Sequence, residues 1–123
     1  MVNMSDKHIL VVEDDDMSFM YIEYILNLAR CNISRVKTGI DAVEACRSVP
    51  KPDLVLLDIQ LPDMNGQKVA AEIRISDHEI PIIAQTASQI SYEQEYILEL
   101  GFNDLIMKPF AVDELLDMIE KHL

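Results

Sequence analysis

The stretch LVLLDIQLPDMNG, residues 54–66, decides the fold of this chain. Its first four residues are all aliphatic, which is typical of a parallel strand covered on both faces. Asp58 follows directly, and a buried carboxylate without a partner is costly. We therefore expect Asp58 either to mark the point where a core strand reaches the surface, or to have a partner that makes use of its charge.

Other short apolar runs repeat this pattern at residues 9–12 and 80–84, and two weaker ones lie at residues 33–36 and 105–107. Between and after them, apolar side chains recur at spacings of three and four residues, as they do on one face of a helix. The first such face is predicted to consist of Met17, Tyr21, Tyr24, Ile25 and Leu28. A later helix is predicted around Ile97 and Leu100.

Several helix ends have a sequence signal of their own. Thr38 precedes Asp41 by three residues and Ser91 precedes Gln94 by three, which is the spacing of a capping box. Gly101 follows a helical pattern and suits a left-handed C-cap. These signals place strands and helices in strict alternation, five of each. Alternation predicts an α/β fold with right-handed crossovers and a doubly wound parallel sheet, in one domain over residues 1–123 with its core at about 7–123.

Composition and charge exclude several classes of protein. The chain has 22 Asp and Glu against 10 Lys and Arg, a formal net charge of -12, which argues against direct nucleic-acid binding. This charge suits a metal cation, or a partner with a basic or apolar docking surface. Cys31 and Cys46 do not form a CxxC pair and are expected to be reduced. Neither a signal peptide nor an apolar run long enough to span a membrane is visible, so a cytoplasmic location is expected.

Polar side chains follow the strands at their carboxyl ends, where open α/β sheets bind their ligands. The first strand is followed by Glu13, Asp14, Asp15 and Asp16, the third by Asp58, the fourth by Thr86 and the fifth by Lys108. Each has an ordinary structural interpretation: a solvated turn with a helix cap, a strand-ending residue, a structural hydroxyl or a surface lysine. Four such coincidences at one edge of one sheet favour a single site.

The chemistry of this set points to phosphoryl transfer. Carboxylates gathered closely repel one another, and a hard divalent cation relieves that repulsion. An all-oxygen site without His or Cys favours Mg²⁺. Asp58 can attack phosphorus and form an acyl phosphate, while Lys108 and Thr86 would hold the phosphoryl oxygens.

These motifs resemble the response-regulator receiver domain of two-component signalling, over about residues 7–123. They are ILVVEDD at residues 9–15, DLVLLD at 53–58 with PDMNG at 62–66, PIIAQTA at 81–87 and KPF at 108–110. The resemblance implies a flavodoxin-like (βα)5 sandwich with the strand order 2-1-3-4-5. The run PIIAQTA is similar to receivers of hybrid sensor histidine kinases, so both a free-standing receiver and one taken from a larger protein remain open.

The resemblance also implies a role for each site residue. Asp58 resembles the phosphoacceptor, and Glu13 and Asp14 resemble the acidic pair that positions Mg²⁺. The backbone carbonyl of Gln60 would supply another metal ligand. The phosphoryl donor would be a phosphohistidine on a histidine kinase or a histidine phosphotransfer domain.

Thr86 and Lys108 resemble the switch hydroxyl and the lysine that contact the phosphoryl group, and the bond from Lys108 to Pro109 is typically cis in the family. Phosphorylation would then bias the surface formed by the fourth helix, fifth strand and fifth helix, through which members often form homodimers. Tyr92, Tyr96 and Phe110 are expected either near that surface or in ordinary packing.

The sequence departs from the family pattern at a few positions. Glu13 replaces the more common Asp and would reach Mg²⁺ through a water, and Leu105 replaces the usual switch aromatic. Gln60 and Ser88 stand where the family tunes its dephosphorylation rate.

Two alternatives belong to other classes of function. A phosphohydrolase with an Asp nucleophile usually has a second Asp two positions later, where this chain has Gln60. A pseudo-receiver that binds proteins without being phosphorylated conflicts with the complete set of site residues. Nucleotide binding through a P-loop or GxGxxG motif is excluded because neither motif is present.

Overall fold

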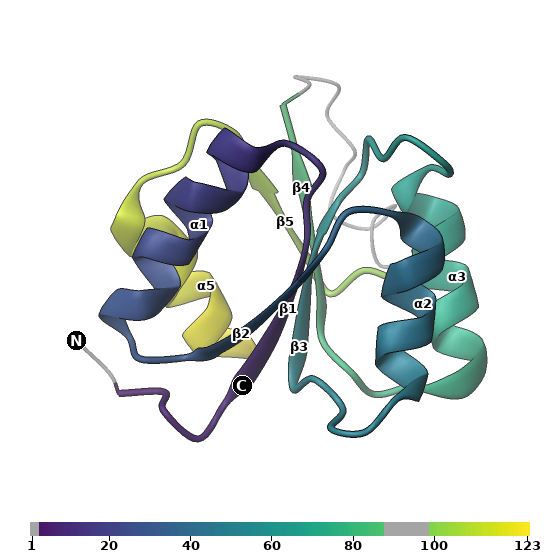
Figure 1. The fold of residues 1–123 in the computed structure, drawn as a ribbon, viewed down its shortest axis with the longest axis horizontal. Helices are drawn as coiled ribbons and strands as arrows, with labels where there is room; N and C mark the ends of the chain where they lie inside the picture. The colour runs from purple at the N-terminus through teal and green to yellow at the C-terminus, as the bar shows by residue number, and fades with distance from the viewer. Residues whose placement is uncertain (1–2, 88–98) are drawn as a thin grey trace.

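A five-stranded parallel sheet forms the centre of the molecule, in a computed structural model that describes residues 3–87 and 99–123 (Figure 1). The strands are β1 (His8–Val12), β2 (Asn32–Val36), β3 (Leu54–Asp58), β4 (Ile82–Thr86) and β5 (Asp104–Met107). Their order is β2-β1-β3-β4-β5, so the predicted flavodoxin-like topology is confirmed. β4 begins at Ile82 rather than at residue 80, because Pro81 has no N–H to donate to the ladder and contributes only its carbonyl, to Val55.

Four helices lie in the part of the chain that the structure describes: α1 (Asp16–Leu28), α2 (Gly39–Arg47), α3 (Gly66–Ser76) and α5 (Val112–His122). α1 and α5 cover one face of the sheet, and α2 and α3 cover the other (Figure 1). The helix predicted around Ile97, with the capping pair Ser91 and Gln94, falls within residues 88–98 and lies outside the described residues. In residues 3–87 and 99–123, every helix is too short or too polar to cross a bilayer.

The hydrophobic core has two halves because side chains of a strand alternate between the faces of a sheet. Ile9 and Val11 of β1 pack under α1 and α5, whereas Leu10 and Val12 pack under α2 and α3. All of β3 is buried, as its uninterrupted aliphatic run predicts. The sheet therefore holds Asp58 on a strand that is covered on both faces.

The buried face of α1 differs from the predicted one. Of the predicted residues only Ile25 is buried, and it packs beside Ile22 and Leu26. The exposed ones are Met17, Tyr21, Tyr24 and Leu28. α1 is apolar on nearly every side, so the spacing of three and four residues fits two different stripes and does not decide which one faces the sheet.

Helix starts follow the capping signals of the sequence. Asp15 caps α1 by accepting a hydrogen bond from the Ser18 amide at 2.8 Å. Thr38 caps α2 by accepting one from the Asp41 amide at 3.1 Å. Gly101 has a φ of 98°, the left-handed conformation expected there.

The segment between β3 and α3 is tied at both ends. The Asp63 carboxylate accepts hydrogen bonds from the amides of Gly39 and Ile40, at 2.8 and 3.1 Å, at the start of α2. The Gly66 amide donates to the carbonyl of Ile59 at 2.8 Å. This loop directly follows Asp58, so these contacts fix the chain next to the candidate site.

Candidate functional site

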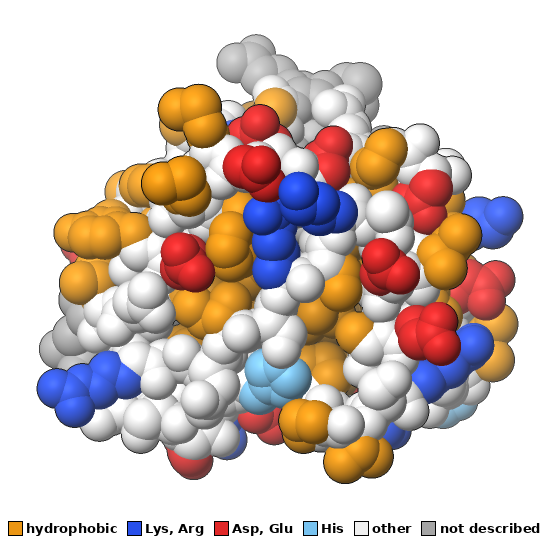
Figure 2. Space-filling view, in the orientation of Figure 1, with side chains coloured by type: hydrophobic (Ala, Val, Ile, Leu, Met, Phe, Trp, Pro, Cys, Tyr) orange, Lys and Arg blue, Asp and Glu red, His pale blue; other side chains and the backbone are white. Residues whose placement is uncertain are grey.

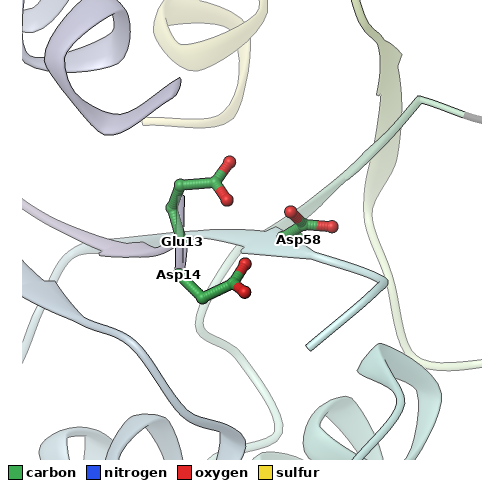
Figure 3. A group of neighbouring side chains, drawn as sticks. All are labelled: Glu13, Asp14 and Asp58. Atoms are coloured by element: carbon green, nitrogen blue, oxygen red, sulfur yellow. The ribbon is translucent and has the colours of Figure 1, made fainter. Parts of the chain in front are cut away.

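The carboxylates predicted to bind metal come together at the carboxyl end of the sheet (Figure 3). Asp58 is the last residue of β3, and Glu13 and Asp14 directly follow β1, the neighbouring strand. Each offers an oxygen within 4.8 Å of those of the other two. Glu13 is 1% exposed and Asp58 8%, whereas Asp14 is open to solvent. The cluster therefore has a buried floor and one open side.

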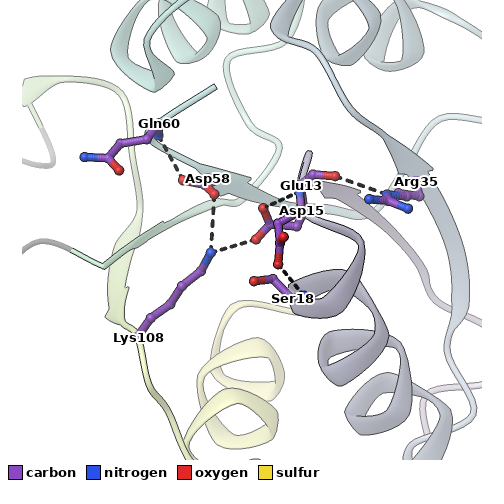
Figure 4. Close-up of polar contacts among 7 residues, drawn as sticks. All are labelled: Glu13, Asp15, Ser18, Arg35, Asp58, Gln60 and Lys108. Carbon is purple, nitrogen blue, oxygen red and sulfur yellow. Dashed lines mark hydrogen bonds and ion pairs between the residues drawn. The ribbon is translucent and has the colours of Figure 1, made fainter. Parts of the chain in front are cut away.

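Lys108 supplies the positive charge of the cluster (Figure 4). Its Nζ lies 2.7 Å from Oε1 of Glu13 and 3.3 Å from Oδ2 of Asp58. It comes from the end of β5, across the sheet from β1. The longer side chain of Glu, compared with Asp, carries its carboxylate to this ammonium group.

Burial and charge shift the protonation of this pair. Burial raises the pKa of Glu13; the Lys108 hydrogen bond acts against that shift and the nearby Asp58 charge adds to it. Burial alone would lower the pKa of Lys108, but its hydrogen bond with Glu13 and the charge of Asp58 outweigh it and raise that pKa. Lys108 therefore stays a cation within the site.

Asp58 is also oriented by its own loop. Its Oδ1 accepts a hydrogen bond from the Gln60 amide at 2.9 Å, while Oδ2 faces Lys108. The two carboxylate oxygens are thus held by different partners. The predicted role of the Gln60 carbonyl as a metal ligand remains a prediction.

Thr86 ends β4, beside β3 in the sheet, and is almost fully buried. Its carbonyl accepts a hydrogen bond from the Lys108 amide at 2.8 Å, so the ends of β4 and β5 are joined at these two residues. The Lys108–Pro109 bond is cis, as the resemblance implies. Thr86 and Lys108 are thus placed at the same edge of the sheet as the carboxylates.

Arg35, which no sequence motif indicated, lies beside residues 13–16, the acidic turn between β1 and α1 (Figure 4). It stands in β2, and its Nε donates to the carbonyl oxygen of Glu13 at 3.1 Å. Its Nη2 lies 2.8 Å from the Asp16 carboxylate, and its guanidinium carbon lies 4.5 Å from the ring centre of Phe19. The only signal in the sequence is a cation inside the short apolar run at residues 33–36.

The donor set fits a magnesium ion. Carboxylate oxygens and no nitrogen or sulfur donors make up the group of Glu13, Asp14 and Asp58. The open side at Asp14 leaves room for the water ligands that Mg²⁺ usually keeps. Glu13 fits less directly, because Lys108 already holds one of its oxygens.

An apolar groove of about 550 Å³ opens beside the site. Its lining residues are Met17, Ser18, Tyr21, Ile22, Ala87, Lys108, Pro109 and Phe110. Tyr21 closes one side by donating a hydrogen bond from its hydroxyl to the Phe110 carbonyl at 2.8 Å. Figure 2 shows hydrophobic side chains gathered over α1, where Met17 is 80% exposed and Met20 65%.

The residues expected near the surface of the fourth helix, β5 and α5 differ in where the structure places them. Phe110 is buried in the core and packs against Tyr21, so ordinary packing describes it. Leu105 is partly buried against the core under α2 and α3. Tyr92, Tyr96 and Ser88 lie outside the described residues.

Comparison with known proteins finds a family model that matches most of this chain. The family model described as "Response regulator receiver domain" matches residues 9–120. The polar-differentiation response regulator DivK of Brucella anthropi is 29% identical over 119 residues, covering 95% of this chain and 96% of its own length. Transcription factor SKN7 of Saccharomyces cerevisiae is 33% identical over 116 residues, but this chain spans only 18% of its length.

Solved structures agree with the sequence comparisons. The receiver domain of sensor histidine kinase PA1611 from Pseudomonas aeruginosa, solved with a magnesium ion in its active-site cleft, has a TM-score of 0.85 and 32% identity. The match covers 94% of this chain and 96% of that domain. The non-phosphorylated HemR receiver domain from Leptospira biflexa has a TM-score of 0.81 and 32% identity, covering 94% of this chain and 92% of that one.

Proposed function

This chain belongs to the response regulator receiver domain family, and on that premise we propose that Asp58 accepts a phosphoryl group from a phosphohistidine. The donor is a histidine kinase or a histidine phosphotransfer protein, the partners of receiver domains in general. The observation that carries the proposal is the cluster of Glu13, Asp14 and Lys108 around Asp58 at the carboxyl end of β3. Receiver domains are generally not true enzymes, and the proposed cycle is self-phosphorylation followed by slow loss of the phosphoryl group.

In the proposed step, a carboxylate oxygen of Asp58 forms a bond to phosphorus as the phosphorus–nitrogen bond of phosphohistidine breaks. The electron pair of the broken bond stays on that imidazole nitrogen, and the ring, which carries a proton on its other nitrogen, leaves as neutral histidine. Lys108 lies 3.3 Å from Asp58 and can follow the new negative charge. Mg²⁺, held by Glu13, Asp14, Asp58 and the Gln60 carbonyl, would supply charge neutralisation at the phosphoryl oxygens.

The proposed output is a change at the end of the sheet. A backbone hydrogen bond joins Lys108 to Thr86. A movement of either residue toward the phosphoryl group would therefore shift the ends of both β4 and β5. Close to two negative charges are added by the phosphoryl group. The surface that includes β5 and α5 is where we propose that a second copy or a downstream protein binds, with Leu105 packing in place of the usual aromatic residue.

We also propose that the phosphohistidine-bearing protein docks on α1. Lys108, which contacts Asp58, lines the groove together with Met17 and Pro109, so a donor bound in this groove would lie beside Asp58. The exposed apolar side chains of α1 give such a donor an apolar contact beside the site. Cys31 and Cys46 are buried free thiols, which suits the cytoplasm in which we place this exchange.

The experiment compares the parent chain with Asp58→Asn. Each is incubated with Mg²⁺ and acetyl phosphate, and intact mass is recorded within minutes. The proposal expects one added phosphoryl group in the parent, dependent on Mg²⁺ and absent from the variant. No gain in the parent with acetyl phosphate or with phosphorylated histidine phosphotransfer domains would favour a pseudo-receiver instead.

A further inference from the structure

We propose that Arg35 is a positioning residue that holds the acidic turn in its metal-binding shape and so sets the affinity for Mg²⁺. The inference rests on the proposed function, because it concerns the same site. Arg35 touches none of the carboxylates in the metal-binding cluster, and acts through the backbone of Glu13.

The contact to Glu13 adds one side-chain hydrogen bond beyond the last backbone bond between β1 and β2. β1 ends at Val12, and the Glu13 amide still donates to the carbonyl of Val36 at 3.1 Å. The next acceptor, the Glu13 carbonyl, is met by Nε of Arg35. Both backbone polar groups of Glu13 are therefore held by β2. The direction in which the chain leaves Glu13, and with it the position of Asp14, is fixed.

The other end of the same guanidinium reaches the start of α1. Its Nη2 pairs with Asp16, the first residue of α1, and its plane lies over the ring of Phe19 one turn further on. The side chain of Arg35 is only 20% exposed and Glu13 is buried, whereas the Asp16 side chain is 70% exposed, so solvent screens the ion pair more than the Glu13 contact. Arg35 thus joins both ends of the turn that carries Glu13 and Asp14.

Charge alone predicts the opposite effect on metal binding. A guanidinium close to the site repels a divalent cation, so removing its charge would tighten Mg²⁺ binding if Arg35 acted only through its field. A positioning role predicts weaker binding on its removal. The sign of the change in affinity therefore separates the two.

Lys37 is a matched control. Its Nζ lies 3.2 Å from the same Asp16 oxygen that Arg35 approaches, but its side chain is 56% exposed. Among the described residues, Asp16 is the ion-pair partner of Lys37. Lys37→Gln removes the same charge from the same carboxylate and leaves the Glu13 carbonyl held.

The experiment measures the Mg²⁺ dissociation constant of the full chain by isothermal titration calorimetry, without any phosphodonor. Arg35→Gln is expected to raise this constant by about tenfold, the usual effect of removing a group that orients a metal ligand. Arg35→Lys keeps the charge but loses the planar fork, and is expected to weaken binding as well. Lys37→Gln is expected to bind as tightly as the parent or more tightly.

Urea unfolding in EDTA, monitored by circular dichroism, checks that each variant is folded at the titration temperature. If Arg35→Gln is not folded, Arg35→Lys takes its place in the comparison. Binding by an Arg35 variant as tight as by Lys37→Gln would overturn the inference while leaving the proposed function standing. A parent that binds no Mg²⁺ would overturn both.

Discussion

Lys108 is the residue on which the charge balance of the site depends. It faces two carboxylates, and Glu13, the closer one, is almost fully buried. Without the ammonium group, the carboxylates of Glu13 and Asp58 would repel each other with no cation beside them. The lysine therefore stabilises the fold as well as serving the proposed phosphoryl transfer.

We predict that Lys108→Met lowers the free energy of unfolding by about 1–2 kcal/mol in metal-free buffer, since it breaks a partly buried ion pair. Urea unfolding in EDTA measures this. Adding magnesium chloride should then restore more stability to the variant than to the parent, because the variant site lacks its own cation. Lys121→Met is the control, since Lys121 is 69% exposed; equal losses in the two variants would contradict the prediction.

Asp104, at the start of β5, is a second buried carboxylate, remote from the site. Burial acts to raise its pKa, but hydrogen bonds from His122 and the Leu105 amide, with the charge of Lys121, outweigh burial and lower that pKa. The His122 Nε2 contact is 2.9 Å. A carboxyl group whose pKa is lowered by folding stabilises the folded state above its unfolded pKa, and this stabilisation is lost as the pH falls toward the folded pKa.

Asp104→Asn is therefore expected to lower the free energy of unfolding at pH 7 by about 1.5–3 kcal/mol, the contribution typical of hydrogen bonds to a charged group. The difference from the parent should shrink as the pH falls below about 4, the unfolded pKa of Asp. Denaturant unfolding at several pH values tests this. Asp117→Asn, on the exposed side of α5, is the control, and a difference that is constant with pH would refute the assignment.

At the residue scale, the sequence predicts those site residues that directly follow a recognisable strand. Asp58, Glu13 and Lys108 each follow a short run of apolar residues, and parallel strands bring such residues to one edge. Arg35 carries no such signal. Its contact with the Glu13 carbonyl depends on the register of β2 against β1 and on a side-chain rotamer, which spacing along the chain does not encode.

At the scale of elements, the loop from Ile59 to Asn65 is set by close backbone contact. A Cβ at Gly66 would lie 2.7 Å from the Cα of Ile59 and 3.3 Å from the carbonyl oxygen of Asp58. The neighbouring atoms are backbone and cannot rotate away. Any side chain at this position would move the loop that holds the Asp58 carboxylate through Gln60.

Gly66→Ala should accordingly destabilise the fold by about 1–3 kcal/mol, as overpacking commonly does. It should also shift the amide resonances of Ile59 and Gln60, because the loop has to give way. Thermal unfolding and a heteronuclear NMR spectrum measure the two effects. Lys68→Ala, an exposed position in the first turn of α3, controls for changes in helix propensity, and matching spectra for the two variants would count against the steric account.

Elements differ in how far the sequence determines them. The continuous apolar runs predict β1, β3 and β4, because strands covered on both faces need them, whereas β2 and β5 follow from weaker runs. Strand order came from the family resemblance, since periodicity does not encode which strands are neighbours. The buried stripe of α1 was predicted wrongly because that helix has apolar residues to spare, and the surplus forms the exposed face beside the groove.

At the scale of the whole molecule, a net charge of -12 on 123 residues makes the folded state repel itself. Salt screens such repulsion over about 10 Å at 0.1 M. We predict that raising sodium chloride from about 0.05 M to about 0.5 M in EDTA raises Tm by about 3–5 °C, equivalent to about 1 kcal/mol for a domain of this size. Differential scanning calorimetry checks this, and a flat or falling Tm would show that local ion pairs, which salt weakens, outweigh the net charge.

The burial of β3 also determines how slowly its amide protons exchange with solvent. Its five residues are covered on both faces and paired with β1 and β4 on both edges. Its amide protons are therefore expected to exchange with deuterium only when the whole domain unfolds, whereas loop amides exchange through small local openings. Asp58, the proposed nucleophile, would then stand on a part of the protein that opens only with global unfolding, and deuterium uptake by β3 would measure how much global stability Mg²⁺ adds if it binds as proposed.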